Sequence, residues 1–317
     1  MTIRFEPLSE RHIMDATALA FEGYRREVRH APALADDGAR DRLGDAIATL
    51  VRQGHGTAAI DDDRLTGYLA FFGPIEGFFG SGTGCFSPLH GLATAGEDRE
   101  RLTSLLFQRA AAGMIANGVD TFAITTWHHD DDVSRSLILN GFGMRCTDAI
   151  RTIDPPLQTE PVPGITFRVL AWSEAGLLLP LLNGLVRHLR RSPTFVAANE
   201  FTSESFAALR ERRKSRFFVA FRNEEPIGYL EVTEDGENVL TTAPDMRNIC
   251  GAYLEPEHRG RGIYQNLLQT VLTTLRGEGV RRVGVDFETM NPTALRFWTK
   301  YFDRYTTSFV RRIDDLG

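Results

Sequence analysis

The fold of this chain is decided by the stretch Leu254-Glu255-Pro256-Glu257-His258-Arg259-Gly260-Arg261-Gly262-Ile263-Tyr264. It predicts a strand that stops at Pro256, a loop of glycines and arginines, and a helix that follows the loop directly. Apolar residues continue at helical spacing through residues 263–275, and two glycines then end the helix. A glycine loop at a helix start presents unpaired N–H groups beside the positive end of the helix dipole. The stretch therefore favours binding of a pyrophosphate.

The loop also has a plain alternative, an ordinary surface turn between a strand and a helix. Other nucleotide-binding motifs fit the chain less well. The Gly-Lys-Ser/Thr of a P-loop does not occur, and no Gly-x-Gly-x-x-Gly stands between a predicted strand and a predicted helix.

The loop resembles that of the GNAT superfamily of N-acetyltransferases, whose acyl-CoA loop reads Arg/Gln-x-x-Gly-x-Gly/Ala. Arg259 and Gly262 match this pattern, whereas Tyr264 stands where the family mostly has Gly or Ala and has the bulk to alter the path of the pantetheine arm. The resemblance implies acetyl-CoA as co-substrate. The cofactor-binding residues that it implies are Tyr253, Leu254, Arg259, Gly260, Arg261, Gly262, Ile263, Tyr264 and Asn291.

The segment that begins at Asn291 resembles a second motif of the family, Asn-x-x-Ala-x-x-x-Tyr. Asn291 is also a good helix N-cap followed by a proline, and that structural role alone explains the residue, so both interpretations stay open. The family usually has a tyrosine where this chain has Trp298. That tyrosine commonly protonates the departing thiolate, which an indole cannot do.

An internal repeat divides the chain of 317 residues, which has room for two domains. Gly67-Tyr68-Leu69 recurs as Gly228-Tyr229-Leu230, and Gly118-Val119 recurs as Gly279-Val280, at a spacing of 161 residues. We expect domains at residues 1–154 and 165–317, joined by a proline-rich linker at residues 155–164.

The predicted fold class is α+β, with two tandem GNAT-like domains that each hold a mixed, mostly antiparallel sheet flanked by helices. In the second half we expect strands at Thr166–Leu170, Phe217–Phe221, Ile227–Thr233, Ile249–Leu254, Arg282–Phe287 and Thr306–Ile313. Helices are expected at Ser173–Arg191, Thr202–Arg213, 263–275 and Pro292–Tyr301.

The first half lacks the glycine loop. Aligned from the helix side, Arg99, Glu100 and Arg101 replace the two glycines and the arginine between them. Aligned from the strand side, residues 88–90 match residues 256–258, and the loop beyond is longer by about seven residues. Three carboxylates near this place, Glu97, Asp98 and Glu100, would repel a pyrophosphate. We therefore expect the first half to bind no coenzyme. It would serve the second half as a structural partner or help to shape the substrate site.

The composition of the chain limits the kinds of molecule that it is expected to bind. The chain is 42% hydrophobic and 25% charged, with a net charge of −6, which argues against nucleic acid and fits a cationic or neutral small substrate. We find no apolar run of transmembrane length and no signal-peptide core, and we expect no membrane partner. Three cysteines (Cys85, Cys146 and Cys250) lie far apart, which favours reduced thiols and a cytoplasmic location.

Two further groups are weaker candidates. The run Trp127-His128-His129-Asp130-Asp131-Asp132 looks like a metal cluster, but acidic residues at a helix start stabilise the helix dipole, and adjacent histidines on an extended segment point to opposite sides. We expect no metal. His90 is the better functional candidate of the first half, although an ordinary surface histidine is the simpler interpretation.

The resemblance implies direct transfer of an acetyl group from acetyl-CoA to a primary amine, which ranges over antibiotics, polyamines, amino acids and protein N-termini. The proton acceptor would be a carboxylate or a water molecule held by one, and the backbone N–H of Leu254 would stabilise the oxyanion. The departing thiolate would be protonated by Tyr264 or Tyr301, or would leave without an assigned acid. The candidate catalytic residues are Leu254, Glu255, Glu231, Glu288, Tyr264 and Tyr301. The alternatives are a non-catalytic acyl-CoA-binding or regulatory protein and an interaction scaffold, as a monomer or a homodimer.

Overall fold

The computed structural model describes residues 3–80 and 82–313. The strands of the first half are β1 (Arg4–Pro7), β2 (His55–Asp61), β3 (Arg64–Glu76), β4 (Thr83–Ser87), β5 (Leu92–Thr94), β6 (Thr121–Trp127) and β7 (Gly143–Thr152). Its helices are α1 (Ile13–Glu27), α2 (Ala39–Gln53), α3 (Arg99–Ala116) and α4 (Asp131–Leu139).

The strands of the second half are β8 (Ile165–Val169), β9 (Arg216–Arg222), β10 (Glu225–Thr233), β11 (Met246–Leu254), β12 (Arg282–Glu288), β13 (Asp303–Arg304) and β14 (Thr306–Arg312). Its helices are α5 (Leu179–Leu189), α6 (Ser203–Arg213), α7 (Ile263–Gly277) and α8 (Pro292–Trp298). The predicted order of elements in this half is confirmed. The long predicted helix before residue 191 begins as a 3-10 turn over Trp172–Leu178 and continues as α5.

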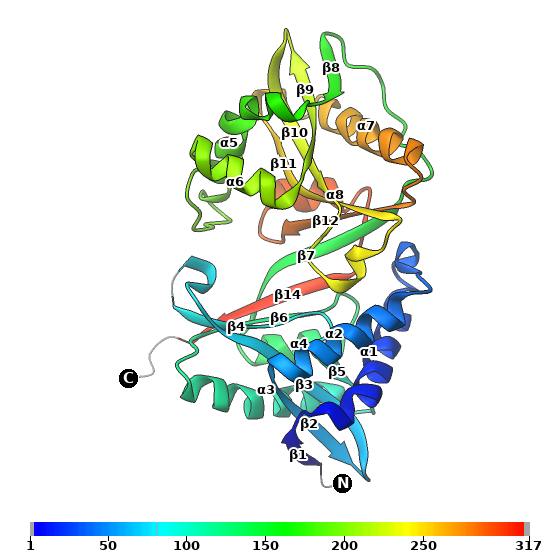
Figure 1. Cartoon of the computed structure of the whole chain (residues 1–317), viewed down its shortest axis with the longest axis vertical. Helices are drawn as coiled ribbons and strands as arrows, with labels where there is room; N and C mark the ends of the chain where they lie inside the picture. Colours follow the sequence, from blue (N-terminus) through cyan, green and yellow to red (C-terminus); the bar gives the residue numbers. More distant parts are fainter. Residues whose placement is uncertain (1–2, 81, 314–317) are drawn as a thin grey trace.

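One sheet runs through both halves, in the strand order β1-β2-β3-β4-β6-β14-β7-β12-β11-β10-β9-β8 (Figure 1). The predicted mixed, mostly antiparallel character is confirmed, because only β4 with β6 and β11 with β12 pair in parallel within the described ranges. In the second half, α7 packs on one face of the sheet and α5 on the other. No helix in residues 3–80 and 82–313 combines the length and the apolar character needed to span a membrane.

The last strands of the two halves are exchanged. Strand β14, from the end of the chain, pairs antiparallel with β6 and β7 of the first half. Strand β7 in turn pairs antiparallel with β12 of the second half. The boundaries at residues 154 and 165 stay a prediction, but neither half completes its own sheet. Sequence pattern identifies these strands and does not identify their neighbours, because pairing is a long-range contact.

The two main cores contain the exchanged residues. The core under α7 and α8 includes Ala149 of β7, and the core under α3 and α4 includes Phe309 of β14. A third core lies between the halves, where Tyr24 and Leu34 of the first half pack with Leu240 and Tyr305 of the second. The halves are therefore joined by packing as well as by strands.

A buried ion-pair cluster also joins the halves. Arg282 of β12 lies with a 9% exposed side chain, and its Nη2 is 2.6 Å from Oδ2 of Asp36 in the first half. The same guanidinium pairs with Asp245, which precedes β11. Asp36 is also held by Arg42 at 2.8 Å.

We expect Arg282→Met to lower the free energy of unfolding by about 3 kcal/mol, because two partly buried carboxylates lose their shared, buried cation. Arg281→Met is the matched control. Arg281 also pairs with Asp245, but its side chain is 80% exposed, so its loss should cost less than about 1 kcal/mol. Chemical denaturation measures both variants. Equal, small losses would show that the buried cluster does not hold the halves together.

Candidate active site

A gap opens where strands β11 and β12 part. The two parallel strands pair only from Met246 opposite Arg282 to Ile249 opposite Val285. Strand β11 continues along β10 to Leu254, with Cys250 as an extra residue because Glu231 lies opposite Gly251 and Val232 opposite Ile249. Such a bulge bends its strand. A pocket of about 400 Å³ lies at the gap.

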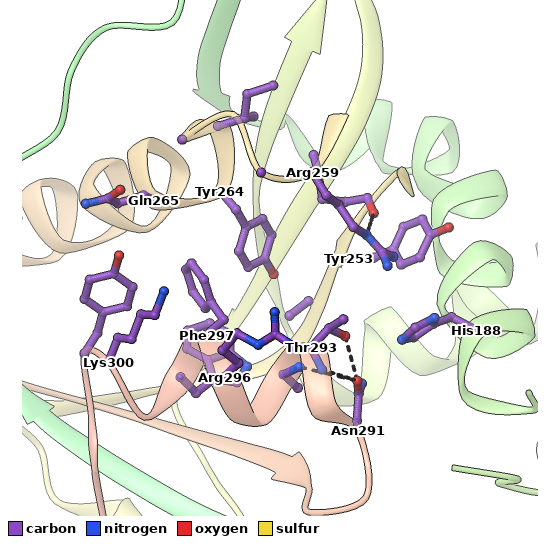
Figure 2. A pocket seen from close by; sticks show the side chains of 18 of the residues that line it. His188, Tyr253, Arg259, Tyr264, Gln265, Asn291, Thr293, Arg296, Phe297 and Lys300 are labelled. Carbon is purple, nitrogen blue, oxygen red and sulfur yellow. Dashed lines mark hydrogen bonds between the residues drawn. The ribbon is translucent and has the colours of Figure 1, made fainter. Parts of the chain in front are cut away.

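Four segments of the chain line the pocket (Figure 2). Helix α5 contributes Leu185 and His188, and β11 contributes Ala252, Tyr253 and Leu254. The loop and α7 contribute Arg259, Gly260, Gly262, Ile263, Tyr264 and Gln265, and the segment of α8 contributes Asn291, Thr293, Ala294, Arg296, Phe297, Trp298, Lys300 and Tyr301.

This pocket passes through the sheet. Helices α7 and α8 belong to the core on one face, whereas α5 belongs to the core on the other. Leu254 packs with the α7 core, and the next residue back, Tyr253, packs with the α5 core. The Tyr253 ring lies so close to the backbone of α5 that a Cβ on Gly184 would stand 2.8 Å from it. A ligand in the gap would therefore be reached from both faces.

The glycine loop forms the upper edge of the pocket in Figure 2. Gly260 and Gly262 adopt φ of 74° and 76°, a region that side chains disfavour. Gly262 is the N-cap of α7 and offers no capping side chain, and the first amide with an acceptor in the helix is that of Asn266. The preceding amides are left open by helix geometry. Arg259 is fixed beside them, since its Nε donates to the Leu254 carbonyl at 2.9 Å.

The sequence-predicted residues separate into two groups. Leu254, Tyr264 and Tyr301 line the pocket, together with Tyr253, Arg259, Gly260, Gly262, Ile263 and Asn291. Arg261 is exposed and, like Glu231, Glu255 and Glu288, is not among the lining residues.

The three carboxylates predicted as catalytic residues lie outside the set of pocket-lining residues. Glu231 is 3% exposed, accepts a hydrogen bond from Ser215 Oγ at 2.5 Å, and lies 3.7 Å from Arg213. Glu288 pairs with Arg145 at 3.0 Å. Burial raises the pKa of Glu288 and of Glu255. Glu231 and Glu288 are thus placed by contacts with distant segments, which spacing along the sequence does not predict.

Tyr264 fills part of the gap between α7 and α8 (Figure 2). Its ring lies edge-on to Phe297 at 5.0 Å between centroids, and 6.2 Å from Trp298. The hydroxyl donates to the Tyr229 carbonyl at 3.4 Å. Burial raises the pKa of the Tyr264 phenol well above its usual range, and burial also raises that of Tyr301. Neither phenol is therefore tuned towards ready proton release.

Asn291 takes the N-cap role that its sequence context predicts. Its Oδ1 accepts from the amides of Thr293 at 3.2 Å and Ala294 at 3.3 Å. It also lines the pocket, so the capping role does not remove it from the site.

His188 is a pocket residue that sequence reasoning missed. It stands among arginines in a stretch whose pattern predicts an ordinary helix. The available signal is helical spacing, because His188 follows Leu181 and Leu185 on one face. Burial lowers the pKa of the imidazole, as does the nearby Arg259, while the Asn291 side chain acts in the opposite direction.

The corresponding place in the first half has a smaller pocket of about 260 Å³, whose lining includes Arg99, Trp127 and Asp130. Arg99 Nε donates to the Thr94 carbonyl at 3.1 Å, as Arg259 does to Leu254. The structure thus matches Arg99 with Arg259. The helix-side alignment, which places Arg99 opposite Gly260, is therefore off by one residue. The strand-side alignment, which places residues 88–90 opposite residues 256–258, is wrong. Helix α3 already begins at Arg99, so an extra helical turn replaces the loop.

In the first half, side chains contact the start of the helix, where the second half leaves amides open. Asp98 caps α3, accepting from the Arg101 amide at 3.4 Å, and Arg99 pairs with Asp130. These contacts agree with the expectation that the first half binds no coenzyme, which stays a prediction. His90 lies elsewhere in this half and is buried, with an Nδ1 that lacks a partner in the described part of the chain.

The two adjacent histidines have separate partners. His128 Nδ1 lies 2.8 Å from Thr307 Oγ1, and His129 Nδ1 lies 2.7 Å from Glu27 Oε1. Among the described residues, the group with ligand atoms close enough to share an ion is Glu255, Glu257 and His258, within 4.8 Å of one another. Exposed acidic groups often cluster without an ion, so the expectation of no metal stays a prediction.

Comparisons with known proteins agree with this architecture. Residues 183–303 match the model of the Acetyltransferase (GNAT) family. A GCN5-related N-acetyltransferase from Sphaerobacter thermophilus superposes with a TM-score of 0.64 at 14% identity, over 99% of this chain and 96% of that one. A tandem GNAT protein from the clavulanic acid biosynthesis pathway gives 0.53 at 14% identity, over 100% of both chains. No curated protein matches the chain in sequence. The predicted tandem-GNAT fold is confirmed.

Proposed function

We propose that this chain, in which residues 183–303 match the model of the Acetyltransferase (GNAT) family, transfers an acetyl group from acetyl-CoA to a primary amine. The observation that carries the proposal is the pocket through the sheet, which joins an uncapped glycine-loop helix start to the gap between β11 and β12.

The loop end of the pocket suits the pyrophosphate. Open amides at the start of α7 donate hydrogen bonds to anionic oxygens, and the helix dipole adds favourable potential. The Arg259 guanidinium adds a positive charge beside them, since Arg259 also lines the pocket. The gap itself is walled by Ala252, Leu254 and Ala294, which suits a thin, largely apolar pantetheine arm. Tyr264 narrows this passage.

The reaction needs an amine nitrogen to attack the thioester carbonyl carbon, with the C–S bond breaking as the amide forms. In our proposal the backbone N–H of Leu254 stabilises the developing oxyanion at the end of β11. Trp298 is 2% exposed and carries no acidic proton suited to the leaving group. A thiol with a pKa of about 8.5 is a good leaving group, so departure as the thiolate is compatible with the absence of a tyrosine at this position.

The setting of the reaction is also proposed. We place the protein in the cytoplasm on the spacing of its three cysteines, and we propose a small-molecule amine as its partner, with the chain acting as a monomer or homodimer. The predicted absence of nucleic-acid and membrane partners is part of the same proposal.

The test is a calorimetric titration with acetyl-CoA, followed by thiol release from acetyl-CoA in the presence of a panel of primary amines. We expect one coenzyme site per chain and amine-dependent release of CoA. Two sites would overturn the assignment of the first half, and no binding would overturn the proposed function. Binding without release on any amine would support a non-catalytic acyl-CoA-binding protein instead.

A further inference from the structure

The pocket contains one side chain suited to accept a proton at neutral pH. Its titratable lining residues in the described part of the chain are three tyrosines, two arginines, a lysine and His188. Lysine and arginine are cationic near pH 7, and tyrosine is protonated. Burial lowers the pKa of His188, so the unprotonated imidazole prevails at neutral pH. The predicted carboxylate bases are not among the lining residues.

His188 reaches the pocket from the face opposite the glycine loop. Helix α5 packs on the Tyr229 side of the sheet, whereas α7 packs on the Leu230 side. His188 lies on the α5 side, with Asn291 next to it in the close-up (Figure 2). A coenzyme bound at the loop would enter the gap from the α7 side. An acceptor that meets the thioester from the other side would arrive beside His188.

We propose, building on the proposed acetyl transfer, that His188 is the catalytic base that takes a proton from the substrate ammonium group. The neutral imidazole nitrogen accepts this proton, and the free amine then attacks the thioester carbonyl carbon. The C–S bond breaks, and the electron pair leaves with the CoA sulfur. The second nitrogen proton passes to the thiolate, while His188 returns its own proton to solvent. The products are the acetamide, CoA thiol and one proton.

The charges around His188 keep its imidazole in the unprotonated form, which can accept a proton. Arg259 faces the imidazole from the glycine loop, and Arg191 faces it from the residues just beyond α5. Both oppose protonation of the imidazole, while the Asn291 side chain favours it, and Tyr253 lines the same pocket from β11. A proton taken from the ammonium is therefore readily released to solvent. Since the free-enzyme pKa is lowered, activity should decline only as the pH falls below about 6.5.

The test compares wild type with His188→Gln and His188→Ala, and uses His55→Gln as a control. His55 is an exposed residue of β2 in the other half. Imidazole NMR resonances, assigned with the variants, are recorded before and after saturation with acetyl-CoA. Thiol release is then measured from pH 5 to pH 9, with ethanolamine as the probe amine, and acetyl-CoA affinity is measured by calorimetry.

We expect acetyl-CoA to shift the His188 resonances and to leave those of His55 in place. His188→Gln should bind acetyl-CoA within about threefold of wild type and lose about 100-fold in kcat, together with the acid limb of the pH profile. Unchanged His188 resonances, or an acid limb that persists in both His188 variants, would overturn the role of His188. Wild-type protein that binds no acetyl-CoA would instead overturn the proposed function itself, so the two failures are distinguishable.

Discussion

Gly262→Asp is expected to weaken acetyl-CoA binding by about 1,000-fold. The new carboxylate would stand at the N-cap of α7, where the pyrophosphate is proposed to sit, and two unit charges about 4 Å apart near a protein surface repel by about 4 kcal/mol. A tenfold loss in affinity corresponds to about 1.4 kcal/mol. Calorimetric titration measures the change directly.

The fold should tolerate this substitution. A Cβ on Gly262 would have Val162 Cγ2 at 3.9 Å and Asn266 Nδ2 at 4.0 Å as its nearest neighbours, so there is space for it. The positive φ costs about 1–2 kcal/mol for a residue with a side chain. Gly262→Ala carries the same backbone cost without the charge, and it should lose much less affinity than Gly262→Asp.

Arg101→Asp is the control in the first half. Arg101 lies in the helical turn of α3 that replaces the glycine loop, and this variant should bind acetyl-CoA like wild type. Equal losses in Gly262→Asp and Arg101→Asp would show that the coenzyme has been assigned to the wrong half.

Phe309→Ala is expected to destabilise the first half of the chain by about 4 kcal/mol, although the residue belongs to the last strand of the second. Phe309 is 0% exposed and packs in the core under α3 and α4, opposite Ile124 of β6. Removing a buried phenylalanine ring costs about 3–5 kcal/mol, through lost burial and the cavity left behind. Because β14 lies in the sheet of the first half, the loss of stability should appear in the first half.

Phe302→Ala is the matched comparison. Phe302 is only seven residues earlier and 4% exposed, but it packs in the core under α7 and α8. Hydrogen exchange followed by mass spectrometry should report lost protection in α3 and β6 for Phe309→Ala, and in α7 and β12 for Phe302→Ala. Loss of protection in α7 with an undisturbed α3 in the Phe309 variant would contradict the exchanged arrangement of β7 and β14.

Several parts of the site could be predicted because they depend on local chemistry. Two glycines directly before a helical apolar pattern identify the loop and the start of α7, and both glycines do adopt positive φ in the structure. An asparagine followed by proline identifies the start of α8. The loss of both glycines and the presence of acidic residues beside them identify the first half as the one without a loop. Each conclusion uses residues within a few positions of one another.

The candidate bases could not be predicted in the same way. Glu231 and Glu288 stand at the right places along their strands, but their side chains meet Arg213 and Arg145, which come from other elements. His188 is a single histidine on a helix, and its position in the pocket depends on how α5 packs across the gap between β11 and β12. Charge partners and pocket walls are contacts between distant segments, which periodicity does not encode.

The sequence by itself determined the tandem repeat, the order of elements in the second half, and the glycine loop at the start of α7, because backbone preference and apolar period act over short stretches. The tertiary structure decided that β7 and β14 are exchanged, that the pocket passes through the sheet, and that His188 lines it. These features depend on which strand lies beside which, and that choice is made by long-range packing of the two cores, in which Ala149 and Phe309 each lie in the half opposite their own.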